Sequence, residues 1–404
     1  MAPPSLESAK ATLEAALEVF ASKDASSQPP GGRAELKALG EKAKQAASRA
    51  ALLASGGRPS DEEVSGVVYG LEQSTIAMCS YSHGFTHEAG PSLKASLKQR
   101  CSGLVEPTQE LVAKLISGAD AGELRNIVGK VWAAVDELVG GPIDNKGCLF
   151  RKLADVMAGV KSAAKELEEL VVESKQDLAA ADRTSAGSHG SLAAAPRTST
   201  EGSQRPPRSS DDEEDDAQSA SGGEDDDGDF RDMGHLSAAE LPTAEAAAGL
   251  LAAAQEAMRA VSRPLLQGPD VSGSHCLDEW ESMAWHAEKL RSSCEGLVAC
   301  LYPPHEDFEE LQGTAESVSI TLELLLSEFP EAYTAAASEA GPVDAEAAGA
   351  EGQQQPQPQA GAGRASALST ALEAAQRSVD ASAQRLLDAL NRQAHAARTG
   401  VPAS

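Results

Sequence analysis

Three side chains that could bind a metal ion recur at regular spacing, since Cys79, His83 and His87 are each four residues apart. Thiolate and imidazole are suitable zinc ligands, and a continuous helix would place all three on one face. At a rise of 1.5 Å per residue, however, the outer two would lie roughly 12 Å apart along the helix, too far for one ion. Gly84 and Gly90 also predict that the helix ends here. We therefore expect ordinary histidines at a helix end and no metal site.

The rest of the chain shows no motif of a known catalytic site. It has no Gly-x-Ser-x-Gly nucleophile elbow, no Walker-type phosphate loop and no glycine-rich dinucleotide turn. Its carboxylates lie in polar runs or at positions expected on helix exteriors. A catalytic carboxyl group usually needs apolar surroundings that raise its pKa. We therefore expect no enzyme activity and no cofactor.

Three serines in the acidic middle of the chain, Ser209, Ser210 and Ser221, are each followed three positions later by an acidic residue. Acidophilic kinases such as casein kinase II favour this pattern. A phosphate would deepen the local negative charge and could attract Arg and Lys side chains of a partner. The serines are candidate phosphorylation sites. The alternative is that this segment only keeps the protein soluble.

The cysteines and tryptophans have plain structural interpretations. The six cysteines are Cys79, Cys101, Cys148, Cys276, Cys294 and Cys300. None forms a Cys-x-x-Cys pair, and such scattered cysteines are typical of reduced thiols in a cytosolic or nuclear protein. Trp280 and Trp285 are five residues apart, so we expect one in a core and one partly exposed. The alternative for the pair is a binding anchor, because Trp is enriched at interface hot spots.

The composition favours helices in every ordered part. Aromatic residues make up 3% of the chain and Ala is abundant, and Ala loses no side-chain entropy in a helix. Gly- and Pro-containing breaks separate the segments, and no alternating run is long enough for a sheet. The expected helices span residues 5–22, 33–54, 61–82, 91–117, 121–139, 144–181, 243–262, 275–301, 305–328 and 364–396. We therefore predict an all-α fold of about ten helices.

Apolar residues recur at alternating gaps of three and four in several segments. One stripe comprises Leu149, Leu153, Val156, Val160, Ala163, Leu167 and Leu170. A second runs from Phe308 to Phe329, and a third from Leu368 to Leu386. Such stripes match the packing of left-handed helical bundles. The first stripe could instead be a zipper for dimerisation, but Phe150, Val171 and Val172 widen its apolar face and favour a bundle core.

Two segments have compositions that leave too little apolar surface to offset chain entropy. One is rich in Ser, Gly and Pro and then acidic, and the other is rich in Gln, Pro, Ala and Gly. We predict that both are disordered. The expected organisation is an N-terminal helical bundle (1–182), the acidic linker (183–235), a C-terminal bundle (236–336), the insertion (337–363) and a final amphipathic helix packing on the C-terminal bundle (364–404).

The charge balance excludes several kinds of partner. The chain has 34 Lys and Arg against 62 Asp and Glu, a formal net charge of -28. Such a surface repels phosphate backbones, which argues against direct nucleic-acid binding. No stretch approaches about 18 uninterrupted apolar residues, so we expect no membrane span. The first residues lack a basic region followed by an apolar run, so we expect no signal peptide.

Two segments resemble a known family. The first is a helix with Val131 and Trp132 near its end, a turn with Pro142, Asp144, Asn145 and Lys146, and a long amphipathic helix. The second begins at Leu277 and Asp278 and ends with Leu301, Tyr302, Pro303 and Pro304. In this order, with an acidic linker between them, the segments are similar to the cyclin-D-interacting (GCIP-like) family. The Gln/Pro insertion near 353–359 and the high Ala content depart from that family.

The resemblance implies an all-α fold of two bundled parts and a helix-loop-helix-like protein without a basic region. It further implies a non-catalytic regulator that binds cyclin D or other helical partners and modulates the cell cycle and transcription, in cytoplasm and nucleus. The alternative is a vinculin- or talin-like helical scaffold for cytoskeletal proteins. Dimerisation stays open on the sequence alone.

Overall fold

The computed structural model describes residues 5–21, 24–56, 59–187, 234–267, 271, 274–303, 305, 307–339 and 360–399. Within these ranges the chain forms ten α-helices, two short 3-10 helices and no strand, so the predicted all-α fold is confirmed. The elements are α1 (Leu6–Glu18), η1 (Val19–Ala21), α2 (Gly32–Ser55), α3 (Asp61–His83), η2 (Gly84–Thr86), α4 (Pro91–Ser117), α5 (Ala121–Gly140), α6 (Asn145–Gly187), α7 (Leu241–Gln267), α8 (Ser274–Cys300), α9 (Phe308–Glu339) and α10 (Ala360–Thr399). None of these helices is long and apolar enough to cross a membrane.

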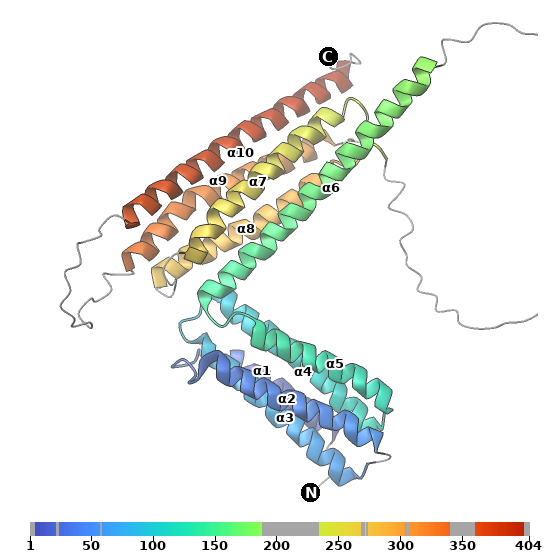
Figure 1. Ribbon diagram of the computed structural model, residues 1–404, viewed down its shortest axis with the longest axis vertical. Helices are drawn as coiled ribbons and strands as arrows, with labels where there is room; N and C mark the ends of the chain where they lie inside the picture. The colour runs from blue at the N-terminus through green and yellow to red at the C-terminus, as the bar shows by residue number, and fades with distance from the viewer. Residues whose placement is uncertain are drawn as a thin grey trace, which may run out of the picture.

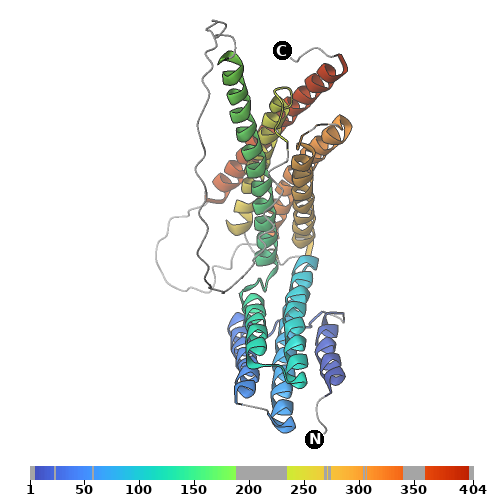
Figure 2. The ribbon, with the colours of Figure 1, turned by 90° about the vertical axis from the view of Figure 1, so that its right-hand side faces the viewer.

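The helices form two bundles, each around its own apolar core (Figure 1). Helices α1 to α5 enclose the first core, and α6 to α10 enclose the second. The two bundles follow one another along the long axis of the molecule (Figure 2). Because α5 ends at Gly140 and α6 begins at Asn145, a short turn over residues 141–144 is the covalent connection between them.

Local sequence signals set the helix ends in the first bundle. At the start of α3, Ser60 Oγ accepts a hydrogen bond from the Glu63 N–H, and the Glu63 carboxylate accepts one from the Ser60 N–H at 2.8 Å. These two reciprocal hydrogen bonds form a capping box. Asp120 caps α5 by accepting from two backbone N–H groups of its first turn. Gly118 ends α4 with φ of 75°, a left-handed conformation that glycine adopts without steric penalty.

The predicted apolar stripes are buried inside the second bundle. The α6 stripe from Leu149 to Leu170 packs against α7 and α8, which confirms a bundle core rather than a free zipper. On α9, the stripe ends at Phe329, whose ring packs edge-on against Trp280 with centroids 5.7 Å apart. Trp280 is 2% exposed and Trp285 is 52% exposed, as predicted for one core and one surface tryptophan.

The two cores divide the chain differently from the predicted domains. Residues 1–182 are predicted as one bundle, but the structure places α6 in the second core, with α7 to α10. An apolar stripe shows that one helix face is buried but does not show which helices cover it. The predicted linker and insertion lie outside the described residues, except for their ends, which extend α6, α9 and α10.

Helix α7 runs past its predicted end at residue 262. Helix α7 continues through Pro264 to Gln267, although proline has no N–H for the helical ladder. Leu265 is only 1% exposed, so burial in the core stabilises this last turn. Helix α9 likewise continues past its predicted end at residue 328.

Candidate protein-interaction site

Trp132 lies on the outer face of α5, beside α2. Its indole Nε1 donates a hydrogen bond to the Lys44 carbonyl oxygen at 3.2 Å, and Lys44 Nζ lies 5.8 Å from the ring centroid. Lys44 also pairs with Asp136 Oδ1 at 2.5 Å. The Trp132 side chain is nevertheless 44% exposed. A large aromatic ring held in one orientation at the surface is typical of a protein-binding anchor.

The predicted turn signature joins the two bundles. Asp144 Oδ1 accepts a hydrogen bond from a backbone N–H in the first turn of α6 at 2.7 Å, and so caps that helix. Asn145 is buried. Its Oδ1 accepts from the Gly90 N–H at 2.8 Å, and its Nδ2 donates to the Glu88 carbonyl at 3.0 Å. Glu88 has φ of 55°, which is uncommon for a residue other than glycine. The amide of Asn145 therefore stabilises a strained turn before α4. Lys146 lies in the first turn of α6.

Two arginines close the C-terminal end of α5. Arg33 of α2 donates through Nη1 to two carbonyl oxygens there, at 2.6 and 2.8 Å. Arg100 of α4 is 6% exposed, and burial lowers its pKa below the ordinary value. Its guanidinium donates to three backbone carbonyls, those of Ser96, Leu138 and Pro142. Cations at this position offset the partial negative charge of the helix end.

A polar contact between the bundles surrounds the first turn of α4. Glu281 of α8 accepts a hydrogen bond from the Ser92 N–H at 2.9 Å and another from the Ser92 hydroxyl. This carboxylate caps α4 from the other bundle, because Gly90 at the N-cap has no side chain to do so. Lys152 of α6 donates to Ser92 Oγ at 3.3 Å and pairs with Glu288 Oε1 at 3.0 Å. Charge-assisted hydrogen bonds therefore join the bundles in addition to the turn.

A cavity of about 380 Å³ lies beside this contact. Three cations line it and face three carboxylates: Arg100, Arg151 and Lys152, and Glu137, Asp155 and Glu288. Cys148 also lines the cavity but is 6% exposed. Burial, and then the negative charge of Glu281, raise the pKa of this thiol. The cavity thus has balanced charge and a protonated thiol, which makes it a poor site for nucleophilic chemistry.

The second family signature forms the turn between α8 and α9. Tyr302 Oη donates to Glu166 Oε1 on α6 at 2.6 Å. Burial and this hydrogen bond raise the pKa of Tyr302 to about 12. Pro303 is partly buried in the same turn. Pro304 and the candidate phosphorylation sites Ser209, Ser210 and Ser221 lie outside the described residues.

A buried hydrogen-bond chain follows this turn and ties it to α7 and α10. His305 Nε2 lies 2.9 Å from the Leu301 carbonyl, and its Nδ1 lies 3.1 Å from Gln393 Nε2, so Nε2 carries the hydrogen. Glu240 accepts from the backbone N–H groups of His305, at 3.0 Å, and Ser237, at 2.8 Å. Burial alone would raise the pKa of Glu240, but these hydrogen bonds hold it below its ordinary value.

The structure does not bring Cys79, His83 and His87 together. Cys79 is fully buried, and His83 packs edge-on against Phe20 with ring centroids 5.5 Å apart. His87 lies beyond the end of α3, where η2 begins at Gly84 as the glycine predicts. Within the described ranges, no group of three His, Cys, Asp or Glu side chains is arranged to hold a metal ion.

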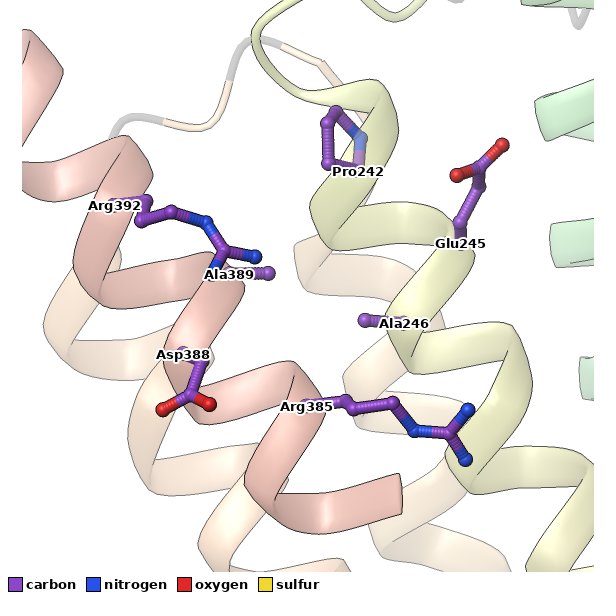
Figure 3. A pocket seen from close by; sticks show the side chains of 7 residues that line it. All are labelled: Pro242, Glu245, Ala246, Arg385, Asp388, Ala389 and Arg392. Carbon is purple, nitrogen blue, oxygen red and sulfur yellow. The ribbon is translucent and has the colours of Figure 1, made fainter. Parts of the chain in front are cut away.

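An open groove of about 390 Å³ lies on the surface between α7 and α10, which pack against each other. Arg385 and Arg392 extend from α10 toward α7, where Pro242, Glu245 and Ala246 form the opposite wall (Figure 3). Asp388 also lines the groove and accepts a hydrogen bond from Gln384 Nε2 at 2.9 Å. The two arginines are balanced by the carboxylates of Glu245 and Asp388, so the groove favours neither an anionic nor a cationic ligand.

Arg100, which closes the end of α5, and Glu281, which caps α4, were not identified from the sequence. Arg100 occupies a position on the buried face of α4, between Leu97 and Leu104, and a charge on that stripe is a signal that could have been used. Glu281 lies in a segment of mixed polarity, and nothing in its spacing indicates that it caps a helix in the other bundle.

Comparison with known proteins gives two related results. Residues 35–173 match the family described as Grap2 and cyclin-D-interacting, N-terminal. The cyclin-D1-binding protein 1 homolog of Danio rerio is 24% identical over 120 residues, which cover 29% of this chain and 35% of that protein. The family match contains α2 from residue 35 onward, α3 to α5, the whole Leu149–Leu170 stripe of α6, Trp132 and the turn signature. The predicted resemblance to the cyclin-D-interacting family is therefore confirmed for this segment, while the Leu301–Pro304 signature lies outside it.

Proposed function

We propose that this chain, which resembles the cyclin-D-interacting family over residues 35–173, is a non-catalytic regulator that binds cyclin D or a similar helical protein. The observation that carries the proposal is the coincidence of the family match with an exposed, fixed tryptophan. Trp132 lies inside the matched segment, and its hydrogen bond and cation–π contact are both made with Lys44. Action on cell-cycle progression and transcription, in cytoplasm and nucleus, is part of the same proposal.

The α2–α5 face around Trp132 has the properties of a binding anchor. The ring is fixed by its hydrogen bond to Lys44, so little side-chain entropy would be lost on binding. Lys44 and Asp136 supply one charge of each sign at its edge. In an interface formed on this face, the exposed indole would bury apolar area at the centre. The ion pair beside it would keep polar groups at the rim.

The test is direct binding of the full chain to a purified D-type cyclin, measured by biolayer interferometry. Trp132→Ala should weaken binding roughly ten-fold or more, as expected for an aromatic hot spot. Tyr69→Ala is the matched control, because Tyr69 is an aromatic residue of the same bundle with 59% exposure. Circular dichroism should show unchanged helix content in both variants.

Two outcomes would count against the proposal in different ways. Absence of cyclin binding by the wild-type chain would reject the partner, and equal binding by Trp132→Ala would reject the site. Affinity purification from cycling cells addresses the scaffold alternative. Recovery of actin-linked proteins without cyclins or transcriptional regulators would favour a vinculin- or talin-like role.

A further inference from the structure

We propose that the outer face of α8 and α9 is a second docking surface, which fits a basic amphipathic helix of a partner protein. Its centre is formed by Trp285, Ile320 and Leu324, which are 52%, 56% and 40% exposed. We refer to these three residues as the α8–α9 patch. It lies outside residues 35–173 and does not depend on the proposed binding of cyclin D.

Contacts between the two helices place the patch on one side of their seam. Hydrogen bonds that cross the seam include Ser293 Oγ to Ser317 Oγ at 2.9 Å and His286 Nε2 to Glu328 Oε1 at 3.1 Å. On α9, Ile320 and Leu324 follow Ser317 by three and seven residues, so they share its side of the helix. On α8, Trp285 directly precedes His286. Ile320 and Leu324 therefore lie between the two hydrogen-bonded residues of α9, along a segment from 317 to 328 that spans about 16 Å, and Trp285 lies just beyond the bond between His286 and Glu328.

The tryptophan of the patch is held in place before any partner binds. Its ring packs edge-on against His286, with centroids 4.9 Å apart, and Lys289 Nζ lies 5.4 Å from its centroid. His286 is itself held by Glu328. Since the indole is already oriented, a partner would gain apolar contact without ordering a mobile side chain.

Small side chains meet along the seam between α8 and α9. Ser293 and Ser317 meet across it, and near its far end a Cβ atom on Gly296 would lie 3.5 Å from Thr314 Cγ2. Small side chains let two helices approach closely, and few atoms of such side chains protrude from the surface where the helices meet. A helix laid over such a seam can place apolar side chains between Trp285 and Leu324.

Charge identifies the partner. Helix α9 contains seven glutamates and no Lys, Arg or His: Glu309, Glu310, Glu316, Glu323, Glu328, Glu331 and Glu339. Glu316 and Glu323 are exposed; Glu316 precedes Ile320 by four residues, and Glu323 lies directly before Leu324. Lys289 lies at the Trp285 end of the patch, whereas the α9 side carries the exposed carboxylates, and that side complements a helix whose apolar face is bordered by Lys and Arg. The same carboxylates disfavour nucleic acid and anionic membranes.

The test uses the full chain and a fluorescein-labelled model peptide of about five helical turns, with Leu at the a and d positions and Lys at the flanking positions. Fluorescence anisotropy should show saturable binding. The double substitution Trp285→Ala with Ile320→Ser should weaken binding roughly ten-fold or more. Leu52→Ser is the matched control, because Leu52 is an isolated apolar residue with 70% exposure in the other bundle. Trp132→Ala should also leave peptide binding unchanged, which separates this surface from the proposed cyclin site.

Several results would overturn the proposal. One is equal binding of a scrambled peptide with the same composition but no apolar face. Another is unchanged affinity in the double variant, provided that circular dichroism shows it to be folded. A third is concentration-dependent dimerisation in sedimentation velocity that the double variant abolishes, because the occupant would then be a second copy of the chain.

Discussion

Gly141 is predicted to be a position where one added methyl group strongly destabilises the first bundle. Its backbone, with φ of -69° and ψ of 168°, is accessible to alanine, so the prediction does not depend on backbone strain. A Cβ atom on Gly141 would lie 1.9 Å from Arg100 Nη1 and 2.5 Å from Arg100 Cζ. The guanidinium would have to leave its position at the end of α5.

The expected magnitude follows from the hydrogen bonds that Arg100 would lose. Moving the guanidinium breaks at least the bonds from Nη1 to Leu138 and from Nη2 to Pro142. A hydrogen bond to a charged group contributes about 1.5–3 kcal/mol. The adjacent cavity would let water restore part of this, so we expect Gly141→Ala to lower the free energy of unfolding by about 2–4 kcal/mol.

Gly129 supplies a control on the same helix with the opposite expected sign. It is exposed in the middle of α5, and nothing lies within 4 Å of an added Cβ atom. Gly129→Ala should therefore stabilise α5 by about 0.5–1 kcal/mol through helix propensity. Urea denaturation followed by circular dichroism would measure both changes. Hydrogen–deuterium exchange of α5 peptides would locate them in the first bundle.

A double-mutant cycle with Arg100→Ala tests the stated cause. Once Arg100 is truncated, Gly141→Ala should have little further effect, since the clashing group is absent. The reasoning is refuted if Gly141→Ala alone lowers stability by less than about 0.5 kcal/mol, or if its effect persists in full beside Arg100→Ala.

Two further predictions concern titratable groups. Cys300 is partly exposed while the other five cysteines are buried, and burial raises the pKa of Cys294 to about 12. One thiol should therefore react rapidly with DTNB, Cys300→Ser should remove that phase, and a second fast thiol would contradict the burial pattern. The pKa of Glu240 is lowered in the folded state, so its carboxylate adds stability above pH 4.5 that is lost as the pH falls through the folded pKa. Glu240→Gln should unfold at lower urea than the wild type at pH 7, and the difference should shrink in acid; a difference independent of pH would contradict this.

The fold was predictable to the extent that it depends on local signals. Alternating apolar gaps identified the buried helix faces, and Gly- and Pro-containing breaks separated one helix from the next. The assignment of α6 to a bundle was not predictable, because its stripe matches any apolar groove and the choice depends on the total area that α7 and α8 offer. Helix α7 was predicted to end at residue 262, before Pro264, but tertiary burial of Leu265 outweighed the helix-breaking effect of the proline.

The sequence could indicate which residues belong to the sites, but it could not indicate which groups those residues contact. The sequence singled out Asn145 and Tyr302 through a family resemblance, whereas the structure shows what they bind: the turn at Glu88 and the carboxylate of Glu166. Such partners are distant in sequence, so spacing alone cannot reveal them. The capping of α4 by Glu281 has the same origin, since the two residues that meet are 189 positions apart.

The membership of α6 in the second bundle has a practical consequence for dissecting the protein. A fragment that stops at residue 182 keeps α6 but removes α7 and α8, so its row of leucines and valines would face water and drive aggregation. Cutting the chain within 188–233 would leave α6 seated among α7 to α10, and the two pieces should stay associated. The two bundles are joined covalently at residues 141–144. Separating them by a cut in this turn would also require breaking the hydrogen bonds between Ser92 and Glu281.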